Sequence, residues 1–187
     1  MRPLPAICVL ACALVSLVAG EAQAQGGSSP EGRLLPEGHQ LTFYGHIAGR
    51  VYLSDARTQG GVGGGVGVRD TLHERFILQA DLNYLMMVGN VGALRLGAGV
   101  QRRGTYTPAA LLTLTTLFGS HLSFLSAEHP TPVRGPGVAL GVSLAPLRFS
   151  RAGMQLSLLE LGVGIGNDLP GWGVSYQLGL LEVGTNF

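Results

Sequence analysis

The feature that most constrains this chain is a two-residue alternation between apolar side chains and polar or small ones. The run from residue 41 to 53, LTFYGHIAGRVYL, shows it most cleanly. Thr42, His46 and Arg50 occupy its even positions. Its odd positions, apart from two glycines, carry Leu41, Phe43, Ile47, Val51 and Leu53. Because successive side chains of a β-strand point to opposite faces, this period predicts a strand with one apolar face.

Similar alternation, bounded by turn-forming residues, recurs along the rest of the chain. We predict eight strands, at residues 41–53, 61–72, 76–88, 91–102, 109–125, 138–149, 154–166 and 174–187. Segment 109–125 is apolar on both faces in its first half, so a helix is the alternative there, although its threonines favour a strand. In the last two strands the alternation breaks at Leu158-Leu159 and at Leu180-Leu181, which predicts β-bulges.

The composition indicates that the apolar faces contact lipid. The chain is 46% hydrophobic and only 12% charged, and all twelve basic residues are arginines. A water-exposed surface usually carries about a quarter or more charged residues. The polar faces hold mainly glycine, alanine, serine and threonine, which suit the narrow lumen of a small barrel. We therefore predict an all-β fold, an eight-stranded antiparallel up-and-down transmembrane β-barrel. The net charge of +1 does not indicate the basic surface that nucleic-acid binding requires.

The N-terminal segment has the pattern of a cleaved secretory signal peptide. A positive charge and an apolar run of about a dozen residues precede the small-x-small sequence AQA at 22–24. Both cysteines, Cys8 and Cys12, lie in this segment, so processing removes any disulfide or cysteine metal ligand. We therefore divide the chain into a signal peptide at 1–24, a flexible periplasmic leader at 25–40 and the barrel at 41–187.

Aromatic residues lie at or near the predicted strand ends, where interfacial girdles form. They are Phe43, Tyr44, Tyr52, Phe76, Tyr106, Phe124, Phe149, Trp172, Tyr176 and Phe187. With its strand count and terminal Phe187, segment 41–187 resembles the small eight-stranded outer-membrane β-barrel proteins of the OmpA/OmpX type. The resemblance implies a bacterial outer-membrane location, insertion by the barrel-assembly machinery, and contact with outer-membrane lipids and lipopolysaccharide. It also implies an assembly signal in the final strand, here Leu181, Val183 and Phe187, with Thr185 at a position where an apolar residue is common.

A few charged residues on the polar faces predict ion pairs inside the barrel. They are His46, Arg50, Asp81, Arg95, Glu160 and Glu182. Closure places the first strand beside the last, so we expect His46 and Arg50 to lie near Glu182. Glu160 and Arg95 could extend the set. Since an unpaired charge in a desolvated lumen is costly, we expect a plug-like network. Conduction of protons or ions is the alternative.

Two other patterns suggest chemistry. His121 and Ser123 resemble the His-x-Ser pair of outer-membrane lipid A deacylases, which are also eight-stranded and use an acidic partner. Here Phe124 stands where that family has Asn, the nearest acid is Glu128, and the alternation places both side chains in the lumen, away from lipid. A nucleophile needs an oriented base, which we cannot assemble, so we expect no catalytic residues.

Glu128 and His129 together with His121 could also be interpreted as a metal site. The chain lacks HExxH, and histidines in or beside a proline-rich loop are far more often simply exposed, so we expect no metal. The glycines at 60–67 do not satisfy GxGxxG, and a P-loop needs a lysine. We expect these glycines to relieve crowding inside a curved strand, and we expect no cofactor.

The sequence thus favours a monomeric, non-enzymatic outer-membrane barrel with a structural or interaction role. Two alternatives remain. One is a narrow route for small apolar molecules through the barrel wall, and the other is a hydrolase that modifies lipid A.

Overall fold

The computed structural model describes residues 38–88, 90–119, 135–168 and 171–187. Gly38–Phe187 forms one compact unit. Its strands are β1 (His39–Ser54), β2 (Thr58–Leu72), β3 (Phe76–Val88), β4 (Val91–Gln101), β5 (Ala109–Gly119), β6 (Gly137–Ala145), β7 (Arg148–Arg151), β8 (Met154–Ser157), β9 (Glu160–Asp168) and β10 (Gly171–Asn186). Within these ranges, no helix has the length and apolar character that a membrane span requires.

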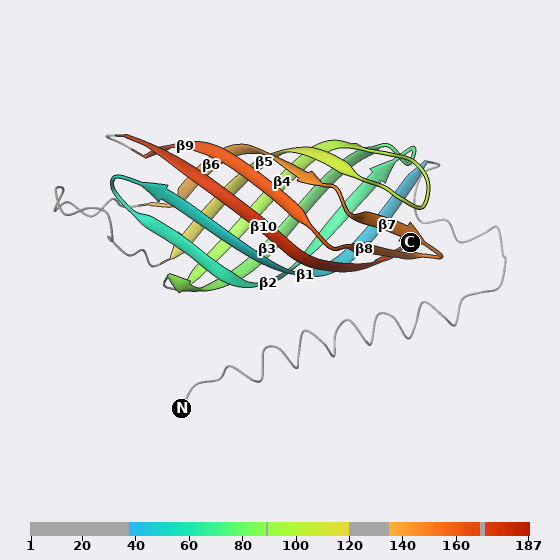
Figure 1. Cartoon of the computed structure of the whole chain (residues 1–187), viewed down its shortest axis with the longest axis horizontal. Helices are drawn as coiled ribbons and strands as arrows, with labels where there is room; N and C mark the ends of the chain where they lie inside the picture. Colours follow the sequence, from blue (N-terminus) through green and yellow to red (C-terminus); the bar gives the residue numbers. More distant parts are fainter. Residues whose placement is uncertain (1–37, 89, 120–134, 169–170) are drawn as a thin grey trace, which may run out of the picture. The chain divides into compact units, whose positions relative to one another are not determined.

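The strands close into an antiparallel barrel with eight positions around its wall. Pairing follows the chain from β1 to β6, continues through β9 and β10, and closes by pairing β10 with β1. Two positions each hold two short strands in line, β6 with β7 and β8 with β9. The tilted strands of this barrel are seen in Figure 1, and the prediction of an eight-stranded up-and-down transmembrane barrel is confirmed.

Three neighbouring strand positions of the barrel wall contain an irregularity. Two are interrupted by a short break, and the third carries one extra residue. Pro146-Leu147 separates β6 from β7, and Leu158-Leu159 separates β8 from β9, where we predicted single strands at 138–149 and 154–166. The register between neighbours is the same on both sides of these two breaks. Against β1, however, Ile47 faces Leu181 while Ala48 faces Gly179, which leaves one extra residue in β10. The predicted bulge is therefore present in β10, whereas the other Leu-Leu pair interrupts its strand without shifting the register.

The strand ends extend beyond several predicted bounds. β2 begins at Thr58, so the first connection contains only residues 55–57, and β9 continues to Asp168. β5 confirms a strand over Ala109–Gly119, while residues 120–125 of the predicted strand lie outside the described ranges. We call the end of the barrel that holds the start of β1 and Phe187 the proximal end, and the opposite end the distal end.

The two faces of the wall separate as the alternation predicts. On β3, Phe76, Leu78 and Leu82 are each more than 50% exposed on the outside, whereas Asp81 and Asn83 are 2% and 3% exposed. Such a surface, with apolar side chains outside and charges inside, is the inverse of a soluble barrel and matches a transmembrane one.

Two aromatic residues depart from the predicted girdles. Tyr44 and Tyr52 are 4% and 0% exposed and lie in the lumen, because they share the inward face of β1 with Thr42 and Arg50. Both rings occupy space left by glycines: a Cβ at Gly67 would lie 2.4 Å from the Tyr44 ring, and one at Gly173 would lie 2.1 Å from the Tyr52 ring. Gly67 of β2 and Gly173 of β10 therefore relieve crowding inside the lumen. The exposed girdle residues among those described are Phe43, Phe76, Tyr106, Trp172, Tyr176 and Phe187. Phe149 is half-buried, and its ring packs against Tyr106 with ring centres 5.5 Å apart.

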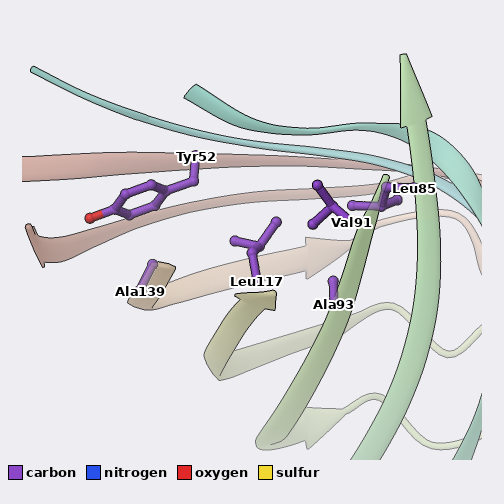
Figure 2. Close-up of a cluster of buried hydrophobic side chains, with 6 residues drawn as sticks. All are labelled: Tyr52, Leu85, Val91, Ala93, Leu117 and Ala139. Atoms are coloured by element: carbon purple, nitrogen blue, oxygen red, sulfur yellow. The ribbon is translucent and has the colours of Figure 1, made fainter. Parts of the chain in front are cut away.

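The distal part of the lumen is filled by an apolar layer. Figure 2 shows its six side chains, which come from β1, β3, β4, β5 and β6. They are Tyr52, Leu85, Val91, Ala93, Leu117 and Ala139. Each of these side chains is 2% exposed or less, so the layer is fully buried.

Candidate functional site

The middle of the lumen is organised around Asp81. This residue of β3 faces Arg95 of β4 across the strand pair, so both side chains enter the lumen together. Arg95 Nε donates to Asp81 Oδ2 at 2.8 Å, and Arg50 Nη2 donates to Asp81 Oδ1 at 2.7 Å. Asn83 Nδ2 also donates to Oδ1, at 2.9 Å. All of these residues are at most 3% exposed, so the carboxylate balances two arginines in a dehydrated space.

Arg95 connects this cluster to the opposite wall. Its guanidinium forms an ion pair with Glu160 of β9, and Gln177 Nε2 of β10 donates to the same carboxylate at 3.0 Å. The chain Arg50–Asp81–Arg95–Glu160 therefore crosses the lumen from β1 to β9. We refer to these four residues as the central network. Each of its charges faces an opposite charge within hydrogen-bond distance.

Glu182 has a different partner from the one that we predicted. In the register it faces His46, as expected, but Arg50 faces Gln177 and pairs with Asp81 instead. Arg69 of β2 holds Glu182 with two bonds, Nη1 to Oε1 at 2.7 Å and Nη2 to Oε2 at 2.9 Å. We did not predict this pair, although Arg69 lies on the same inward face of β2 as its glycines.

Several side chains fix Arg69 and His46 in place. Arg69 donates to Gln79 and Gln155, and its guanidinium lies 4.5 Å from the centre of the Tyr44 ring, a cation–π distance. His46 Nε2 lies 2.5 Å from Asn83 Oδ1 and 3.9 Å from Asp81 Oδ1.

A second pair that the sequence did not reveal lies at the distal end. Arg57 holds Asp168 with Nε to Oδ2 at 3.1 Å and Nη2 to Oδ1 at 2.8 Å. The same guanidinium donates to the carbonyls of Gly135 and Pro136, and Ser54 Oγ donates to Asp168 at 2.5 Å. Because both charged residues fall in segments that we predicted as loops, alternation gave no signal for them. This pair joins the first connection, the start of β6 and the end of β9.

The three predicted assembly residues lie along the outer face of β10 and just after it. Leu181 and Phe187 are exposed, and Val183 is half-buried. The Phe187 ring packs edge-on against Phe43 of β1, with ring centres 5.9 Å apart and planes at 78°. Phe187 also exchanges backbone hydrogen bonds with Leu41, at 2.8 and 3.3 Å, so the last residue completes the seam between β10 and β1.

The candidate catalytic and metal-binding residues cannot be placed in the barrel. His121, Ser123, Glu128 and His129 lie outside the described ranges, as does Phe124. Over the ranges that are described, no group of three or more His, Cys, Asp or Glu could hold a metal ion.

Two cavities show how the lumen is filled. The one beside the central network, lined by residues that include His46, Ser157, Glu160 and Glu182, measures about 10 Å³. That is roughly the smallest volume that accepts one water molecule. The second opens at the proximal end, measures about 780 Å³, and is lined by polar residues that include Thr71, Gln101 and Thr107. Over the described ranges, side chains thus pack closely around the central network, and the proximal end is open.

Comparison with solved structures agrees with this architecture. The chain is similar to Ail, the attachment invasion locus protein of Yersinia pestis, with a TM-score of 0.51 and 12% sequence identity over 80% of this chain and 99% of that one. The N-terminal β-barrel domain of Pseudomonas aeruginosa OprF gives a TM-score of 0.48 at 12% identity, covering 78% and 97%. Neisserial surface protein A gives 0.45 at 11% identity, covering 81% and 98%. No protein-family model and no curated protein sequence matches the chain.

The fold and the lumen together define a class, a closed eight-stranded transmembrane barrel with a charged, side-chain-filled interior. Within that class, the chain has the architecture of the small outer-membrane barrels to which Ail belongs, and the predicted resemblance to them is confirmed.

Proposed function

We propose that this protein is a non-enzymatic barrel of the bacterial outer membrane that keeps its lumen closed and acts through its outer surfaces, in a structural or interaction role. The observation that carries the proposal is the filled lumen. The cavity beside the central network measures about 10 Å³, and the apolar layer of Figure 2 lies distal to the network.

The charges of the network support a closed state. Asp81 pairs with Arg50 and Arg95, and Glu160 pairs with Arg95, so neither carboxylate is left free to hold a passing cation. A route for small apolar molecules would need an apolar passage, whereas the cavity lined by Gly179 and Leu181, next to the extra residue of β10, is also lined by Glu160 and Glu182. Moving an apolar solute past buried carboxylates would break charge-assisted hydrogen bonds without replacing them.

The location proposal combines the outer face with the N-terminal segment. Large apolar side chains cover the outside of the wall, and residues 1–24 have the features of a signal peptide for export. Outer-membrane lipids and lipopolysaccharide would then surround the barrel. Because β10 pairs with β1, the closed sheet offers no free edge for strand pairing with a second copy, which favours a monomer.

Heat-modifiability of the expressed full chain tests the location and the barrel together. Outer-membrane fractions are run with and without boiling on a denaturing gel. We expect the unboiled protein to migrate differently from the boiled one and to be absent from soluble fractions. A soluble protein without a mobility shift would overturn the proposal.

The terminal signal can be separated from simple packing by a matched pair of variants. Phe187→Ala and Phe43→Ala both remove the same ring contact, which is worth about 0.5–1.5 kcal/mol beyond the area that it buries, and both keep the backbone hydrogen bonds of the seam. If Phe187 also serves the barrel-assembly machinery, Phe187→Ala strongly reduces the amount assembled in cells while Phe43→Ala does not. Equal assembly of the two variants would leave Phe187 with a packing role only.

A further inference from the structure

The proximal half of the lumen contains an arginine without a partner. Arg148 of β7 is 0% exposed, and none of its guanidinium nitrogens has a hydrogen-bond partner among the described residues. Arg50, Arg57, Arg69 and Arg95, the other buried arginines in those ranges, each form an ion pair.

The residues on either side of Arg148 repeat this pattern. Ser157 of β8 is its partner in the strand register, and the Thr107 backbone N–H donates to the Arg148 carbonyl at 2.8 Å. Thr107 and Ser157 are each 2% exposed, and both hydroxyls lack a partner in the part of the chain that the structure describes. The connection before β5 and the strands β7 and β8 therefore place two hydroxyls and a guanidinium at neighbouring positions, all of them buried and unsatisfied.

The neighbouring acid does not complete this group. Glu182 is the next residue across the sheet, facing Ser157, but Arg69 holds both of its carboxylate oxygens. Counted over the described ranges, the buried arginines number five, Arg50, Arg57, Arg69, Arg95 and Arg148. The buried acids number four, Asp81, Glu160, Asp168 and Glu182. A buried cation without a counter-charge is strongly unfavourable, so one negative charge is missing from this region.

The group lies just below the proximal mouth, and neither Arg148 nor Ser157 lines the mouth itself. Thr107 itself lines the 780 Å³ cavity, and so does Ser150, which lies two residues from Arg148 on β7. Two strand residues span about 7 Å, so the Arg148 backbone lies about one side-chain layer below the mouth.

We propose that Thr107, Arg148 and Ser157 form a binding site for a small inorganic oxyanion of the phosphate or sulfate class. A guanidinium presents a planar fork of N–H donors that matches two oxygens of such an anion. The two hydroxyls can donate to its remaining oxygens. The anion supplies the missing negative charge and satisfies the unpaired donors at once.

Phosphate titration of the refolded full chain in detergent tests the site. Isothermal titration calorimetry, at constant ionic strength set by a bulky organic sulfonate, should show saturable one-to-one binding of inorganic phosphate. Arg148→Gln should weaken this binding on the order of tenfold or more, because it removes the charge-assisted hydrogen bonds. Ser157→Ala should weaken it less. Arg102→Gln, an exposed arginine between β4 and β5, is the matched control and should bind like the unmodified chain.

Heat uptake that does not saturate, or equal binding by the Arg148→Gln and Arg102→Gln variants, would overturn the proposal and leave water as the filling of this region. If Arg148→Gln does not fold, Ser157→Ala decides, since it keeps the charge: unchanged phosphate affinity in that variant would contradict the site. Sulfate should compete with phosphate, whereas competition only by nonspecific salt would count against an oxyanion site.

Discussion

Arg95 and Arg148 are the same residue type at nearly the same burial, 1% and 0% exposed, in two regions of one lumen. Arg95 lies between Asp81 and Glu160 in the central network, whereas Arg148 has no partner among the described residues. The central region resembles a protein core in which charges replace apolar side chains. The proximal region has the chemistry of a binding site, because its donors are arranged but unused.

The contrast teaches that burial alone does not identify a structural charge. In the central region every charge is neutralised by a neighbour, so its role can be to fill and hold the barrel. Near the proximal mouth, the same burial without a partner indicates a missing component. Substitutions in the two regions should therefore differ in their effect on the free energy of unfolding.

The largest effect is expected from Arg95→Met. Removing this guanidinium leaves Glu160 without an ion pair in the described lumen and leaves Asp81 with Arg50 and the more distant His46. Breaking a buried pair from one side typically costs about 3–5 kcal/mol. Urea unfolding in detergent, followed by the fluorescence of the single tryptophan, Trp172, measures the loss. The exposed control Arg102→Met should change the free energy of unfolding by less than about 0.5 kcal/mol.

A smaller effect is expected where the two regions meet, at Tyr44. Its hydroxyl lies 3.4 Å from Asp81 and its ring lies over Arg69, so it links the central network to the Arg69–Glu182 pair. Gly67→Ala forces a Cβ into this ring and should destabilise the barrel by about 1–3 kcal/mol. Gly92→Ala is the matched strand control, since a Cβ there meets nothing within 4 Å. Equal unfolding midpoints for the two variants would show that Tyr44 is not tightly packed.

The smallest effect is expected from Arg148→Met in a buffer without phosphate or sulfate. Because this variant removes a charge that has no ion-pair partner in the described lumen, stability should change by less than about 1 kcal/mol or increase. Added phosphate should then stabilise the unmodified chain but not the variant, by mass action. If Arg148→Met lowered the free energy of unfolding as much as Arg95→Met in the same urea titration, the two regions would not differ in the way described.

Much of the fold followed from alternation alone. The residue pattern of each strand distinguishes its inward face from its outward face. The barrel, its strand count and the inward position of Asp81 and Arg95 were therefore all predictable. The girdle assignment of Tyr44 and Tyr52 was wrong because position near a strand end was given more weight than the face that they share with Arg50.

The partners inside the lumen were harder to predict than its residues. Arg69 and Glu182 are 113 positions apart, and they meet because of strand tilt and the residue inserted in β10, neither of which a single strand reveals. Arg57 and Asp168 were missed because both lie in segments that read as loops. Arg148 was missed because Pro146-Leu147 reverses the alternation just before it, so that the simple period of the predicted strand placed its side chain outside.

The central claim, a transmembrane barrel whose lumen is closed by its own side chains, is tested most directly by electrical recording. The refolded full chain is inserted into a planar lipid bilayer, and current is followed at constant voltage in potassium chloride. The filled central network predicts insertion without regular conductance steps, with insertion verified by heat-modifiability of the reconstituted protein. Uniform, reproducible steps from the unmodified chain would contradict a closed lumen.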